Sequence, residues 1–316
     1  MKLFPEKYFI YIVIALALTR FWGIWQDEIQ PWDEGLYASR IKACVEKDMW
    51  LDQTELAPGG LYSSAHPPLV IWSNAVFVEI FGQHEFAYRI ATAAFGCMLI
   101  IMIYLTPIRK LKGLIAAAII SASPFIFYYS GHSQLDIPLA FFIILGVFFW
   151  RRFEKYRDNK YLWLTGIAFG FGLWTKIIVA VILPMSICAY LLFLYFKRQR
   201  ELKEIIYQTA VITLTGILII LPWIIFMYSR HGGEFLDQFL FFHLFERSLQ
   251  GVEGNVKSLG IFYYFNQIAV IVPLAAAFFM MNLRNVFKDR RNWLFLFAFG
   301  VPFVIFTLAK TKLAAY

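Results

Sequence analysis

Long apolar runs are the feature that most constrains the fold of this chain. Runs of roughly 17–25 apolar residues are long enough to cross a bilayer as helices. Of the 316 residues, 60% are hydrophobic and 16% are charged, a composition outside the usual range of soluble domains. The pattern predicts an all-α polytopic membrane protein with about nine transmembrane helices, near 8–22, 89–107, 114–130, 135–150, 161–175, 177–196, 205–228, 260–281 and 293–309.

The distribution of charge predicts the orientation in the membrane. If the N-terminus is cytoplasmic, the inner segments hold 18 of the 29 Lys and Arg but six of the 21 Asp and Glu. The inner side then has a net charge of +12 and the outer side −4, as the positive-inside rule expects, and all five histidines fall outside. We therefore attribute the basic balance to topology and expect the lipid bilayer, and no nucleic acid, as a partner.

The N-terminal run has two interpretations. Met1–Lys7 followed by Ala15-Leu16-Ala17 is similar to a secretory signal peptide with its cleavage site. Arg20-Phe21-Trp22, directly after the run, favours the interfacial end of a retained span.

Two long outer segments, 23–88 and 229–259, interrupt the predicted spans. In the first, one helix is expected to begin at Asp33 and another at Pro67-Pro68, the latter ending at Gly82. Both would lie on the membrane surface, joined by a turn at Gly59-Gly60. Internal repeats and nucleotide-binding glycine motifs are absent from the sequence, which predicts one domain over 1–316 with 23–88 and 229–259 as its two long outer loops.

Charged residues at the membrane boundary are the candidates for function. Asp33 and Glu34 form an acidic pair just beyond the first span, and the alternative for Asp33 is a helix N-cap. Lys176 lies between two apolar runs, where a cation is costly, and its alternative is a side chain that reaches back to the interface. Asp136 stands at the start of a span, where it would bind substrate or cap the helix with Pro138 nearby.

An acidic pair in the first outer loop, followed by an interfacial helix entered through a basic residue and Pro-Pro, resembles the membrane glycosyltransferases of the GT-C fold. The similar branch contains the protein O-mannosyltransferases and the lipid A aminoarabinose transferases. Stretches that match in the family's order are Asp33 to Ala38, His66 to Leu69, Phe86 to Arg89, Leu135 to Leu139, Gly172 to Lys176, Leu221 to Trp223, His243 to Arg247, and Lys310 to Leu313 with Tyr316.

Two departures from the family pattern stand out. Many relatives have Lys where His66 stands, and relatives continue through further spans, often with an outer C-terminal domain. We therefore expect the C-terminal part of the family pattern to be missing from this chain.

The resemblance implies transfer of a sugar, hexose or pentose, from a polyprenyl-phosphate donor to a hydroxyl of a lipid, glycan or protein. It implies an active site facing the exterior of the bacterial inner membrane, with 23–88 as the outer catalytic loop. Asp33 would take the proton of the acceptor hydroxyl, supported by Glu34, with Asp136 at the donor sugar. Fixed positive charge would meet the donor phosphate, and the candidates for binding it are His66, Lys176, Arg247, Lys310, Lys312 and Tyr316.

Some assignments stay open in the sequence. Arg247 is equally compatible with a surface pair to Glu246, and Arg89 is expected to anchor the second span. Histidine and carboxylate suit zinc or manganese, but the spacings match no zinc motif, so no cofactor is expected to be required and a divalent metal remains possible. The residues that would form such a site are His66, His132, His231, His243 and Asp136.

Other functional classes compete with a transferase. A transporter or lipid flippase also has many spans and intramembrane charge, but the sequence lacks the repeats and broken span pairs typical of transporters. An inactive scaffold is a third possibility.

Overall fold

The computed structural model describes residues 5–106, 110–246, 263–266 and 293–308, with single positions 273, 277, 280 and 281. Every regular element in these ranges is a helix. The predicted sites at Arg247, Lys310, Lys312 and Tyr316 lie outside the described residues, as does most of the predicted span 260–281.

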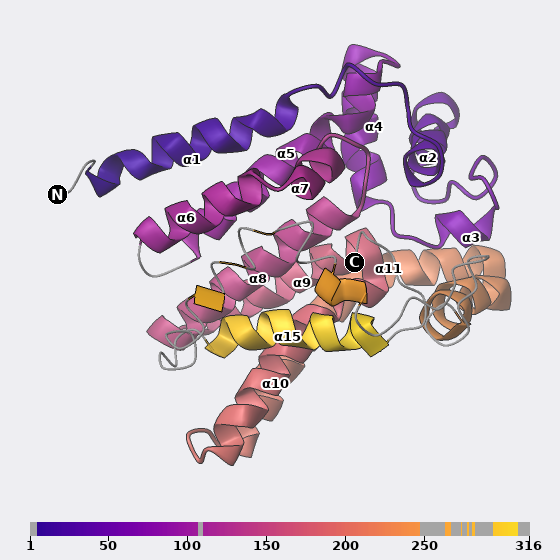
Figure 1. Ribbon diagram of the computed structural model, residues 1–316. Coiled ribbons are helices and arrows are strands. Elements are labelled where there is room, and N and C mark those ends of the chain that lie inside the picture. The colour runs from indigo at the N-terminus through magenta and orange to yellow at the C-terminus, as the bar shows by residue number, and fades with distance from the viewer. Residues whose placement is uncertain are drawn as a thin grey trace.

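The described membrane helices follow the predicted apolar runs closely (Figure 1). Among the described residues, three helices are long and apolar enough to cross a bilayer, namely α5, α9 and the one over Leu202–Phe239, or four with one bent pair. This confirms a polytopic helical membrane protein, while the number of nine spans stays a prediction. The elements are η1 (Glu6–Tyr8), α1 (Phe9–Leu18), η2 (Thr19–Phe21), α5 (Glu85–Leu105), α8 (Asp136–Tyr156), α9 (Asn159–Ala180), α10 (Ile182–Phe196), α11 (Leu202–Leu236), η3 (Asp237–Glu246) and α15 (Trp293–Leu308).

The run predicted as one span over 114–130 is two helices, α6 (Lys110–Ser121) and α7 (Pro124–Ser130), bent by 72°. Proline in the first turn lacks the N–H that would continue the preceding helix. The hydroxyl of Ser123 accepts a hydrogen bond from the Ile126 N–H at 3.5 Å and caps the new helix. The apolar run predicted as a span over 114–130 is therefore broken between α6 and α7.

The first long loop folds into three short helices at one end of the bundle, on the right in Figure 1. They are α2 (Asp33–Lys47), α3 (Leu61–Ser64) and α4 (Leu69–Phe81). Tyr37, Ile41 and Cys44 on one face of α2 are buried in the same cluster as Val70 and Ile71 of α4. The two predicted helices are confirmed, including their starts, whereas α3 was not expected.

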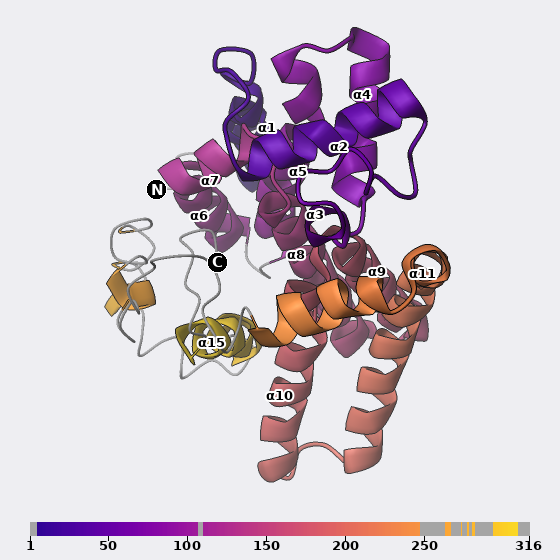
Figure 2. The same cartoon turned by 90° about the vertical axis from the view of Figure 1, so that its right-hand side faces the viewer.

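Close helix packing places the ends of α8, α9 and α11 near this loop. A Cβ added to Gly166 of α9 would come within 2.5 Å of Thr215 Cβ on α11, and one on Gly170 within 2.7 Å of Ile219 Cδ1. Small residues let two helix backbones approach in this way. Figure 2 shows α10 and α11 running side by side to a shared loop, and η3, which follows α11, contacts α3.

Candidate active site

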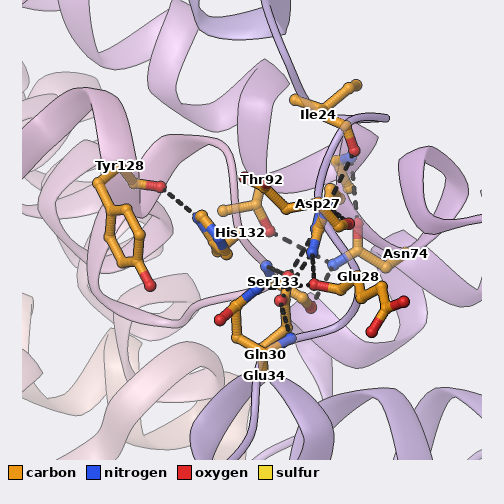
Figure 3. Close-up of polar contacts among 12 residues, drawn as sticks. Ile24, Asp27, Glu28, Gln30, Glu34, Asn74, Thr92, Tyr128, His132 and Ser133 are labelled. Atoms are coloured by element: carbon orange, nitrogen blue, oxygen red, sulfur yellow. Dashed lines mark hydrogen bonds and ion pairs between the residues drawn. The ribbon is translucent and has the colours of Figure 1, made fainter.

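A buried ion pair fixes the start of α2 (Figure 3). Arg89 on α5 donates from Nε to Glu34 Oε1 at 2.7 Å and from Nη2 to Oε2 at 2.9 Å, and each side chain is 1% exposed. Glu34 also accepts the backbone N–H groups of Gln30 at 2.8 Å and Ser133 at 2.9 Å. The guanidinium of Arg89 further donates to the backbone carbonyls of Ile24, Asp27 and Glu28.

These contacts decide the charge of Glu34. Burial alone would raise the pKa of its carboxyl group, but the hydrogen bonds from Arg89, Gln30 and Ser133 outweigh burial and lower the pKa. Glu34 is therefore ionised at neutral pH, and both of its carboxylate oxygens accept hydrogen bonds from Arg89 and from backbone N–H groups. It holds the backbone on which Asp33 stands, while the predicted supporting role toward the Asp33 carboxylate stays a prediction.

Asp33 is the first residue of α2 and is exposed. The N-cap position belongs to its neighbour Trp32, whose side chain makes no capping hydrogen bond. A carboxylate in the first turn is stabilised by the positive end of the helix dipole. Asp33 thus presents an exposed carboxylate at a fixed point at the start of α2, as a base requires.

Lys176 and Asp136 form an ion pair between α9 and α8. Lys176 Nζ lies 3.0 Å from Asp136 Oδ1, and the two side chains are 13% and 17% exposed. The Lys176 backbone leaves the helical conformation inside α9 (φ −153°, ψ 90°). Asp136 is the first residue of α8. The N-cap residue is Leu135, and no side chain makes a capping hydrogen bond there.

The charges of Asp33, Asp136 and Lys176 all act on the hydroxyl of Tyr37 and on that of Tyr129. Burial, and then the negative charge of Asp33, raise the pKa of Tyr37. The structure therefore brings three predicted site residues, from α2, α8 and α9, into one electrostatic neighbourhood.

The position of His66 depends on Arg40, a residue that the sequence analysis missed. Arg40 is fully buried and donates from Nη2 to the His66 carbonyl at 2.8 Å and from Nη1 to the Ser63 carbonyl at 3.1 Å. Its Nε and Nη2 also bond Gln53 Oε1, at 3.3 and 2.8 Å. Burial lowers the pKa of Arg40 to about 10, so it remains charged at neutral pH. The sequence held a signal for this residue, because Arg40 follows Tyr37 by three positions and so shares the apolar face of α2.

A second missed cluster ties the loop to the end of α11. Asp52 Oδ2 lies 2.8 Å from His231 Nε2 and 3.4 Å from Arg230 Nε. Trp223 Nε1 donates to the Leu51 carbonyl at 3.1 Å. The segments before and after the central helices are thereby held together.

The histidines and Asp136, which the sequence left open as a metal site, do not form one within the described part of the chain. His132 Nδ1 lies 2.7 Å from the Tyr128 carbonyl (Figure 3), and His231 bonds Asp52. In the described ranges no group of three or more His, Cys, Asp or Glu side chains lies close enough to hold an ion, and the side chain of His243 falls outside them.

The chain is similar to membrane glycosyltransferases in sequence and in structure. It is 24% identical to an uncharacterized protein of Aquifex aeolicus and 26% identical to the undecaprenyl phosphate-α-4-amino-4-deoxy-L-arabinose arabinosyl transferase of Pseudomonas aeruginosa. These alignments cover 98% and 90% of this chain but 61% and 52% of the relatives, so the chain spans little more than half of their length.

Among solved structures, that of ArnT from Cupriavidus metallidurans bound to undecaprenyl phosphate superimposes with a TM-score of 0.77 at 20% identity. The match covers 99% of this chain and 57% of the other. The transporter alternative receives no support from these similarities. A family model for dolichyl-phosphate-mannose-protein mannosyltransferases matches residues 65–226, just over half of the chain. The chain belongs to this family and has the GT-C glycosyltransferase fold.

Proposed function

We propose that this chain transfers a sugar from a polyprenyl-phosphate donor to an acceptor hydroxyl at the exterior face of the bacterial inner membrane. The observation that carries the proposal is the Lys176–Asp136 pair at 3.0 Å in a helix break, in one electrostatic neighbourhood with the exposed carboxylate of Asp33. A cation, a carboxylate that holds it and a second carboxylate nearby suit displacement at a sugar phosphate.

The residues divide the chemistry between them. The acceptor oxygen attacks the anomeric carbon, and the bond from that carbon to the phosphate oxygen breaks. The phosphate leaves with the bonding electron pair, and Lys176 stabilises the negative charge that grows there. Asp33 takes the proton of the hydroxyl as the new bond forms. Asp136 orients Lys176 through the 3.0 Å ion pair, and we propose that it also accepts a hydrogen bond from a hydroxyl of the donor sugar.

The names of the relatives indicate two classes of donor sugar. The Pseudomonas relative is named for a 4-amino-4-deoxy-L-arabinose carried by undecaprenyl phosphate, and the family model is described by dolichyl-phosphate mannose. Both donors are phosphodiesters that join a polyprenol to C1 of the sugar through one phosphate, and the sugar is a pentose in one and a hexose in the other. We propose this shared phosphate-lipid chemistry for the donor, and a lipid, glycan or protein hydroxyl for the acceptor.

We further propose that the transfer requires no metal cofactor. A lipid phosphate is already a good leaving group, and Lys176 and His66 would supply cationic or hydrogen-bonding groups for it. Transfer should therefore be unchanged, within about twofold, after EDTA treatment. Loss on chelation and recovery with Mn²⁺ or Zn²⁺ would contradict this part of the proposal.

The test uses the purified protein in lipid nanodiscs. Undecaprenyl-phosphate aminoarabinose and undecaprenyl-phosphate mannose are supplied with an envelope glycolipid extract, and released undecaprenyl phosphate is measured. Release in the wild type and its loss in Asp33→Asn are expected. Transfer from UDP- or GDP-sugars with no use of either lipid donor would refute the proposal.

A further inference from the structure

Trp32, directly before α2, has a backbone conformation that suits glycine. Its angles are φ +69° and ψ −125°. The chain adopts nearly the same conformation at two other described positions, Gly60 (φ +60°, ψ −125°) and Gly232 (φ +56°, ψ −136°). Asp48 and Arg157, which also have positive φ, lie in the left-handed helical region at helix C-caps, where such residues are more common. Trp32 therefore stands where the chain otherwise uses glycine.

The neighbouring contacts hold this conformation in place. The Leu36 N–H bonds the Trp32 carbonyl at 2.9 Å, and the Gly35 N–H bonds the Gln30 carbonyl at 2.9 Å. Gln30 is fixed in turn by the carboxylate of Glu34, which Arg89 anchors to α5. Residues on both sides of Trp32 are thus set by the buried ion pair, so the strain is imposed from outside.

The side chain of Trp32 does not compensate for this strain by packing, because it is 90% exposed. A large aromatic residue with an unfavourable backbone and almost no burial contributes little to folding. Strained residues held by their surroundings cluster at functional sites. Trp32 is moreover bonded directly to Asp33, the candidate base.

We propose that the indole of Trp32 is a platform on which a sugar ring of the acceptor stacks while one of its hydroxyls reaches Asp33. This inference rests on the proposed function and narrows the acceptor to one that carries a sugar. One face of a pyranose presents C–H groups and its rim presents hydroxyls. A rigid, flat indole suits the first and the adjacent carboxylate accepts from the second.

An exposed tryptophan at a membrane boundary can instead anchor the protein in the interface. Trp22 and Trp25, at the end of the first span, are 68% and 57% exposed and available for that task. Neither has a positive φ. Anchoring in the interface does not require a backbone conformation that favours glycine. It therefore does not explain the strain at Trp32.

The experiment compares Trp32→Gly, Trp32→Ala and Trp32→Tyr with the control Trp25→Ala, all in nanodiscs. Methyl glycosides of glucose, glucosamine and mannose are the probes, and saturation-transfer NMR reports which sugar protons contact the protein. Contacts on one ring face are expected in the wild type, in Trp32→Tyr and in Trp25→Ala. At least a fivefold loss is expected in Trp32→Gly and Trp32→Ala, although Trp32→Gly should have the higher Tm because it relieves the strain.

Two results would overturn the platform. One is unchanged sugar contact in Trp32→Gly. The other concerns fluorescence quenching by brominated lipids. The signal of the Trp32 indole is the difference between the wild type and Trp32→Phe, and quenching of that signal as strong as the quenching of Trp25 would show that Trp32 lies in the lipid. Because sugar contact is measured without turnover, the platform and the transferase proposal fail separately. Loss of contact in Trp32→Gly with no release of undecaprenyl phosphate by the wild type would reject only the transferase.

Discussion

Arg89 binds both carboxylate oxygens of Glu34, at 2.7 and 2.9 Å, although 55 positions separate the two residues. Removing one partner from a buried pair leaves an uncompensated charge, which costs about 3–5 kcal/mol, whereas replacing both by apolar residues costs far less. We expect Glu34→Leu and Arg89→Met each to lower the free energy of unfolding by that amount. The double variant should lose less than the sum of the two, although the backbone groups bonded to Glu34 and Arg89 lose their partners. Thermal unfolding in detergent measures the cycle, and additive losses would show that the pair does not act as a unit.

The contact between Asp52 and His231, which we call the clasp, should make the Tm of the protein sensitive to acid. Burial alone would raise the pKa of Asp52, but hydrogen bonds from the Thr54 hydroxyl and N–H, and then from His231, lower that pKa below the ordinary value of an aspartate. A carboxylate with a lowered folded-state pKa stabilises the fold above its unfolded-state pKa, and this contribution is lost as the pH falls through the folded-state value.

The Tm of the wild type should therefore lose this contribution below about pH 4 and keep it unchanged from pH 5 to 7. Asp52→Asn should have a lower Tm at pH 7 and a flatter profile below pH 4. The control is Glu55→Gln, which changes an exposed carboxylate in the same loop. If the Tm of the wild type and that of Asp52→Asn fell in parallel as the pH is lowered, the clasp would not be an acid-sensitive contact.

Helices and their limits were largely predictable because apolar runs and glycine or proline signals are local. The run near 89–107 is α5, and Pro67-Pro68 and Gly82 bound α4. The bend at Ser123-Pro124 was carried by a local signal too, but a proline is also tolerated inside a membrane span.

The site was predictable as a set of residues but not as a geometry. Asp33, Asp136 and Lys176 were singled out because charges at a membrane boundary are costly. That Lys176 pairs with Asp136, 40 positions away, and that Asp52 meets His231, 179 positions away, depends on how the helices pack. The strained turn at Trp32 is set by the distant Arg89, so no local pattern marks it.

Asp33→Asn should lower transfer by about 100- to 10,000-fold, the usual contribution of a general base, with little change in Tm. The amide has nearly the same shape as the carboxylate, and the Asp33 side chain is exposed. Glu28→Gln, another exposed carboxylate of the loop, should keep full activity. Near-normal transfer in Asp33→Asn would assign the base to another group.

Topology can be tested with cysteines in a background lacking Cys44, Cys97 and Cys188. A membrane-impermeant maleimide should label a cysteine at exposed Glu55 in intact cells, and one at exposed Gln199 only after permeabilisation. The charge split of +12 inside against −4 outside is the reason for this expectation. The reverse labelling pattern would place Asp33 and Lys176 in the cytoplasm and remove the argument for a lipid-linked donor.

Lys176 is predicted to act on the donor phosphate as well as on Asp136, and a charge swap separates the two tasks. Lys176→Glu places a carboxylate against Asp136 and should cost about 1–3 kcal/mol of stability together with nearly all transfer. The swap Asp136→Lys with Lys176→Glu restores an ion pair of opposite polarity between α8 and α9 and should recover much of the Tm. It should not recover transfer, because the cation then stands on α8 and the phosphate meets a carboxylate on α9. Lys176→Met should lose turnover more than stability. A swapped variant that regained activity along with its Tm would mean that Lys176 serves only to hold the two helices together.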